Sequence, residues 1–122
     1  MLVALITVLF LSGGSQSQLL DGLNAAGKRV ETTVVAGDRR AEAKAIIKKM
    51  KSKAKSHEKE FKQVAKSLKN IFSGHEFSES EANEIWQQYF EGAVDYRREM
   101  VVLQFELRDQ ISREEWKAIF AD

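Results

Sequence analysis

The sequence predicts an all-α fold: an antiparallel long helical hairpin, extended to a three- or four-helix bundle and preceded by an apolar N-terminal segment. Three observations predict it. Apolar residues recur at alternating steps of four and three along most of the chain. The 122 residues include no Pro, which argues against many short strands and turns. The basic and acidic residues also separate into two blocks, as expected for two helices that attract each other.

The first long helix is predicted over residues 38–73. Gly37 supplies a break before it, Asp38 is the expected N-cap, and Gly74 lies where a helix C-cap belongs. Its apolar positions have the spacing of a coiled-coil seam. The seam consists of Ala43, Ile47, Met50, Ala54, His57, Phe61, Val64, Leu68 and Ile71.

The second long helix is predicted to begin at Ser78, which forms a capping box with Glu81, and to end near Gln110. Phe77 precedes the box, where it can form a hydrophobic staple with Ala82. The seam residues of this helix are Ala82, Trp86, Tyr89, Ala93, Tyr96, Met100, Leu103, Leu107 and Gln110. A second box, Ser112 with Glu115, opens a short last helix that carries Trp116, Ile119 and Phe120.

The connection at residues 73–77 is short, so the two long helices are expected to run antiparallel. Facing residues then have numbers that sum to about 151, which sets His57 opposite Ala93 and Val94 and within reach of Tyr96. Met50 falls opposite Met100 or Val101, and Phe61 opposite Tyr89 or Phe90. The second helix is apolar over a wider face than one partner covers. The last helix, the amphipathic stretch with Leu19, Leu23, Ala26 and Val30, or a second copy of the chain would cover the rest.

An apolar run of ten residues, Leu2–Leu11, precedes a small polar stretch. Residues 1–14 would span about 21 Å as a helix, whereas a bilayer core is about 30 Å thick. The run therefore suits a signal peptide, or a short membrane anchor if it is retained. We divide the chain into residues 1–18 (signal peptide or anchor), 19–37 (amphipathic segment and linker) and 38–122 (helical hairpin domain). The expected location is periplasmic, exported or membrane-anchored.

Charge is segregated between the two long helices. Residues 38–73 hold 12 basic and four acidic side chains, a net charge of +8, and residues 75–122 hold five basic and 12 acidic ones, a net charge of −7. We favour attraction between the helices as the reason. The alternative is anion binding, at a membrane surface for example, by Lys44, Lys48, Lys51, Lys55, Lys59, Lys62 and Lys66. Nucleic acid is not expected as a ligand, because no aromatic residues are interleaved with these lysines.

His57 occupies a seam position where Leu or Ile would be expected. It is interpreted first as a core histidine hydrogen-bonded to a neighbour such as Tyr96, and otherwise as a metal ligand or a pH-sensitive group. Gly92, about opposite, marks either a close helix approach or a small pocket facing His57. His75 is too far from His57 to share a metal. No catalytic constellation and no phosphate-binding loop is present, so neither enzymatic activity nor a cofactor is expected.

Two stretches read Phe77-Ser78-Glu79-Ser80-Glu81 and Ile111-Ser112-Arg113-Glu114-Glu115. With the leader and the long hairpin, they resemble the periplasmic heavy-metal-sensor and stress-chaperone family, which carries repeated Leu-Thr-x-x-Gln motifs. The Leu, Thr and Gln of the motif are each replaced here. The resemblance implies an all-helical, non-enzymatic, dimeric exported protein that senses metal or holds misfolded partners.

Together these patterns predict a non-enzymatic exported or membrane-tethered protein that acts by binding a protein partner or by self-association, a homodimer included. The alternatives are a metal- or pH-responsive sensor centred on His57, and a binder of polyanions or anionic lipid. The candidate partner-binding residues are Trp86, Phe90, Val94, Val101, Phe105, Trp116 and Phe120.

Overall fold

The computed structural model describes residues 16–74, 76 and 78–120. The described residues form α2 (Gln16–Thr33), α3 (Asp38–Ser73), α4 (Glu79–Gln110) and α5 (Arg113–Phe120), with no strand among them. The prediction of an all-α fold is therefore confirmed. The apolar run Leu2–Leu11, His75 and Phe77 lie outside the described residues. None of the helices in the described part of the chain is long and apolar enough to cross a membrane.

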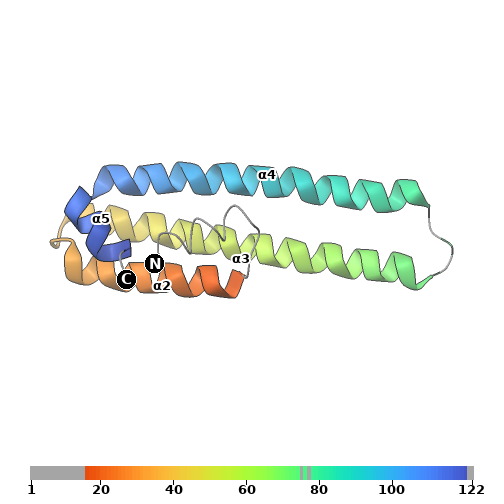
Figure 1. Cartoon of the computed structure of the whole chain (residues 1–122), viewed down its shortest axis with the longest axis horizontal. Coiled ribbons are helices and arrows are strands. Elements are labelled where there is room, and N and C mark those ends of the chain that lie inside the picture. The colour runs from red at the N-terminus through yellow and green to blue at the C-terminus, as the bar shows by residue number, and fades with distance from the viewer. Residues whose placement is uncertain (1–15, 75, 77, 121–122) are drawn as a thin grey trace.

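The two long helices, α3 and α4, lie side by side and run in opposite directions (Figure 1). Cross-helix contacts set their register. Phe61 meets Tyr89 and His57 meets Tyr96, with ring centroids 5.7 and 4.2 Å apart. Among the described residues, an ion pair also links the two helices: Lys53 Nζ lies 2.7 Å from Glu99 Oε2.

The shorter helices α2 and α5 cover only one end of the α3–α4 pair (Figure 1). The apolar spacing of α2 places one face against this pair, and four of its side chains are at most 1% exposed: Leu19, Leu23, Ala26 and Val30. The Arg29 guanidinium donates a hydrogen bond of 2.9 Å to the Ile119 carbonyl oxygen, which ties α2 to α5. The core therefore lies at this end of the molecule.

Beyond the start of α2, residues 61–73 of α3 and 79–92 of α4 continue as two helices (Figure 1). We call this region the distal part. Leu68 is the one buried side chain among its described residues, and Phe61 is 51% exposed although it belongs to the predicted seam. The seam spacing identifies the face that points to α4, but one neighbouring helix shields only part of a Phe ring on that face.

The helix ends follow local hydrogen-bonding groups. Ser78 Oγ accepts a hydrogen bond from Glu81 N at 3.1 Å. Ser112 and Glu115 form the full reciprocal box, with Ser112 N donating to the carboxylate at 2.7 Å and Glu115 N donating to Ser112 Oγ at 3.1 Å.

The predicted N-cap of α3 is wrong. Gly37 occupies the cap position with no side-chain hydrogen bond, and Asp38 is the first helical residue. The reason is the backbone of Gly37, whose φ of 143° turns the chain so that its carbonyl oxygen accepts the first hydrogen bond, from Ala41 N. The carboxylate of Asp38 still lies in the first turn, where its negative charge interacts favourably with the positive end of the helix dipole.

Candidate functional site

Helix α4 carries an exposed apolar surface beside its buried seam. Successive residues turn by about 100° around a helix, so the face next to Ala93, Tyr96 and Met100 is turned away from α3. This face is 38–58% exposed at five positions, which we name the α4 apolar surface: Trp86, Phe90, Val94, Val101 and Phe105. All five were predicted as partner-binding candidates; four of them lie off the predicted seam, and Trp86 belongs to it.

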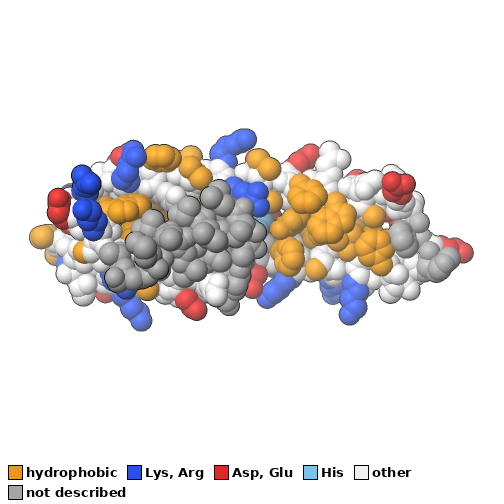
Figure 2. All heavy atoms as spheres, viewed as in Figure 1, with side chains coloured by type: hydrophobic (Ala, Val, Ile, Leu, Met, Phe, Trp, Pro, Cys, Tyr) orange, Lys and Arg blue, Asp and Glu red, His pale blue; other side chains and the backbone are white. Residues whose placement is uncertain are grey.

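The distal end of this surface is an aromatic cluster. The Trp86 ring stacks on Phe90 with centroids 5.6 Å apart, and both rings contact Tyr89 at 6.2 and 5.7 Å. Tyr89 in turn contacts Phe61 of α3. Figure 2 shows hydrophobic side chains gathered on the distal part, beyond the start of α2. Clustered aromatic rings exposed in this way are typical of the centre of a protein interface.

A shallow hollow of about 950 Å³ lies next to the cluster. Its apolar lining comes from Trp86, Phe90 and Val94, and its polar rim includes Glu91 and Asp95. At the other end of the α4 apolar surface, the Arg108 guanidinium lies 4.6 Å from the centre of the Phe105 ring. The surface thus combines an apolar centre with charged margins, a composition shared by protein interfaces.

The two remaining partner-binding candidates do not belong to this surface. Phe120 is only 6% exposed, and its ring lies 4.5 Å from that of Trp116, which packs partly buried against the same core. In this structure Phe120 is a core residue and not part of the exposed apolar surface. The spacing of α5 correctly indicates an apolar face, and this face is buried because it packs against α2.

His57 lies in a cleft between α3 and α4. Its ring is parallel to that of Tyr96, with an interplanar angle of 4°. The cleft has a volume of about 390 Å³, and Gly92 lines it, so the interpretation of this glycine as the wall of a small pocket agrees with the structure. The polar groups around it come from both helices: Ser52, Lys53, Ser56, Glu60, Asp95 and Glu99.

Two buried polar atoms in this cleft, His57 Nδ1 and Tyr96 Oη, have no hydrogen-bond partner among the described residues. The two rings stack face to face, so the expected hydrogen bond between them is not formed. Burial lowers the pKa of His57 below its ordinary value; the nearby Glu60 carboxylate partly opposes this shift, and the Arg97 guanidinium adds to it. Burial also raises the pKa of Tyr96 to about 12.

No group of three His, Cys, Asp or Glu side chains within the described ranges could hold a metal ion. Met50 and Met100 are 2% and 0% exposed and serve as core residues. The cleft at His57 can therefore respond to pH through one imidazole, and the described residues do not supply the further ligands of a metal site.

The predicted anion-binding lysines divide into two groups. Lys44, Lys48 and Lys51 line a groove between α3 and α2, whereas Lys55, Lys59, Lys62 and Lys66 project from α3 outside it. The structure adds Lys28 and Asn24 of α2 to the groove. Sequence reasoning missed both, because it considered the lysines of one helix and had no measure of how α2 packs on α3.

Comparison of the chain with protein-family models, with curated proteins and with solved structures finds no match. The resemblance to the heavy-metal-sensor and stress-chaperone family thus rests on the two capping motifs and the helical pattern alone.

Proposed function

We propose that the chain is a non-enzymatic, exported or membrane-tethered helical protein that acts by associating with a protein partner or with a second copy of itself. In this proposal the antiparallel hairpin, extended by α2 and α5 into a bundle, presents the α4 apolar surface for contact. Export or tethering is supported by the apolar run Leu2–Leu11. A periplasmic accessory or chaperone-like role would fit the family resemblance.

The observation that carries the proposal is the aromatic cluster of Trp86 and Phe90. These two rings stack on one another and are 38% and 58% exposed, and Val94, Val101 and Phe105 continue the apolar surface. Burial of such a surface against a partner is favourable, because it removes apolar side chains from water. Fully burying one Phe side chain contributes about 2 kcal/mol. Burial of the exposed half of Phe90 is therefore worth roughly 1 kcal/mol, about a fivefold change in affinity for each copy that takes part.

The test is site-specific photo-crosslinking in the native cell, with the crosslinking residue at position 90. Position 35 is the matched control, because Val35 is a 77% exposed apolar residue on the α2–α3 connection, away from α4. A discrete adduct from position 90, either with the chain itself or with one protein, and none from position 35 would support the proposal. Equal labelling from both positions, or no adduct from either, would contradict it.

A second candidate function is a pH-responsive one centred on His57. The specific observation behind it is the buried Nδ1 atom that has no hydrogen-bond partner among the described residues. Protonation of this ring would place a cation near the Glu60 carboxylate, which favours it, and near the Arg97 guanidinium, which opposes it. The cleft is also lined by Lys53, Asp95 and Glu99. The pH dependence of the free energy of unfolding measures whether the ring responds in this way.

A further inference from the structure

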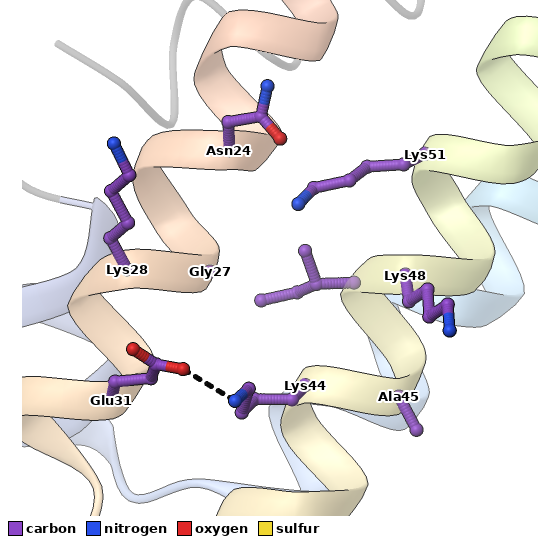
Figure 3. A pocket seen from close by; sticks show the side chains of 9 residues that line it. Asn24, Gly27, Lys28, Glu31, Lys44, Ala45, Lys48 and Lys51 are labelled. Atoms are coloured by element: carbon purple, nitrogen blue, oxygen red, sulfur yellow. Dashed lines mark hydrogen bonds and ion pairs between the residues drawn. The ribbon is translucent and has the colours of Figure 1, made fainter.

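The groove between α2 and α3 has a volume of about 710 Å³, and Gly27 is one of the residues that line it (Figure 3). A Cβ atom added there would meet Lys51 Nζ at 3.7 Å and Ile47 Cγ2 at 3.8 Å. These are ordinary contact distances, so a longer side chain at position 27 would project into the space that Lys51 now reaches. Position 27 therefore faces the groove, and a large side chain there would occupy part of it.

The charge in the groove is strongly positive. Four lysines line it, Lys28, Lys44, Lys48 and Lys51, against one acid, Glu31. Lys44 Nζ lies 2.5 Å from Glu31 Oε1, and this hydrogen bond lowers the pKa of Glu31, so the carboxylate stays ionised and offsets one of the four cations. The side chains that line the groove thus carry a net charge of +3.

Lys51 is the central cation. Its side chain extends from α3 across the groove towards α2, as does that of Lys44, whereas Lys48 points away from α2 (Figure 3). Lys51 is partly buried, and it has no carboxylate partner among the described residues. Its ammonium group lies 3.7 Å from the position that a Cβ atom would take at Gly27, and it can pair with an anion that enters the groove.

The spacing of the donors suits a compact, multiply charged anion. Lys44 and Lys51 are seven residues apart, about 10.5 Å along the axis of α3 and on the same face. Their flexible four-carbon stems allow both ammonium groups to turn towards one ligand between them. Asn24 adds a side-chain amide, which can donate two hydrogen bonds. A phosphate group accepts several such hydrogen bonds at once, which a carboxylate does less well.

We propose that the α2–α3 groove binds a phosphate group, held by Lys51 and Lys44 of α3 together with Asn24 of α2, while Lys28 adds positive charge at the margin of the groove. The group can belong to free phosphate or to an anionic lipid headgroup. Its binding stabilises the packing of α2 on α3, since the anion contacts both helices.

The experiment titrates the full-length chain with inorganic phosphate, followed by calorimetry and by amide NMR shifts of α2 and α3. Co-sedimentation with phosphatidylcholine vesicles, with and without phosphatidylglycerol, forms the second arm. If inorganic phosphate binds and shifts the amide signals of Gly27 and Lys51, the ligand is free phosphate. If the chain binds only to vesicles that contain phosphatidylglycerol, the ligand is the lipid headgroup. Absence of both overturns the proposal.

Matched variants separate the groove from general surface charge. Lys51→Gln should weaken binding about fivefold, the usual effect of one partly exposed ion pair. Lys59→Gln removes the same charge from α3 outside the groove and should change binding less than twofold. Equal loss in the two variants would show attraction to the whole basic helix and would overturn the site.

Two further variants should change phosphate binding in opposite directions. Glu31→Gln removes the carboxylate and releases Lys44, so it should tighten binding, while Glu84→Gln on α4 should leave it unchanged. Gly27→Leu fills the groove without a change of charge and should abolish binding. Its helical content is checked by circular dichroism, and if it does not fold, the opposite effects of Lys51→Gln and Glu31→Gln decide the question.

Discussion

Replacement of His57 by Phe is expected to stabilise the protein. Phe keeps a flat ring that can stack on Tyr96 at the observed 4.2 Å separation, and it removes a buried nitrogen that has no hydrogen-bond partner among the described residues. An unsatisfied buried polar atom costs about 1–3 kcal/mol. Because His57 is partly exposed to the cleft, we expect the lower end of this range, a gain of about 1 kcal/mol in the free energy of unfolding at neutral pH.

The gain should grow as the pH falls. The folded-state pKa of His57 is lowered, first by burial, so the unfolded chain binds a proton more readily than the folded one. The stability of the wild-type protein is therefore complete above the unfolded-state pKa of about 6.5 and declines as the pH drops from there towards the folded-state pKa. The His57→Phe variant has no imidazole at this position and should lack this part of the pH dependence.

The assay is urea unfolding followed by circular dichroism at a series of pH values from neutral to mildly acidic. Tyr96→Phe is the control, because it removes the other unsatisfied buried atom but no group that titrates near neutral pH. It should raise stability by about 1 kcal/mol at every pH in the series. A His57→Phe variant that is less stable than the wild type, or that shows the same acid dependence, would refute this account of the cleft.

Three further substitutions test the packing and the helix ends by the same unfolding assay. Leu23→Ala should cost about 3 kcal/mol, since the side chain is 1% exposed in the core, and a loss below about 1 kcal/mol would contradict the placement of α2. Ser112→Ala should cost about 1 kcal/mol, because its hydroxyl accepts the Glu115 N–H that opens α5; an unchanged midpoint would argue against this cap. Gly92→Ala should gain up to about 1 kcal/mol from helix propensity, because the new Cβ would lie an ordinary 3.5 Å from Glu60 Oε2; destabilisation would indicate closer helix packing than observed.

The elements that local chemistry dictates could be predicted from the sequence. The seam spacing and the flanking glycines predict a helix over 38–73, and α3 spans Asp38–Ser73. Ser78 and Ser112 mark the starts of α4 and α5 because their hydroxyl groups satisfy backbone N–H groups a few residues away. The amphipathic stretch proposed for residues 19–37 is helical as far as Thr33, and the connection to α3 follows.

Features that depend on packing between distant segments could not be predicted. Periodicity identifies the faces that carry Phe61 and Phe120, but it does not say how many helices cover each face, and the first is half exposed while the second is buried. The groove is a similar case. Lys28 and Lys51 are 23 residues apart in sequence, and only the packing of α2 on α3 brings them to one cavity.

The distal part links the proposed association to the stability of the fold. Leu68 is its one buried side chain among the described residues, and helices without such packing are marginal in water. The attraction between its basic and acidic helices is screened by solvent and adds little. Occupation of the α4 apolar surface would bury Trp86 and Phe90 in this same region. Since a ligand stabilises the structure it binds, association should slow amide hydrogen exchange at residues 61–73 more than in α2, where the core already protects the backbone.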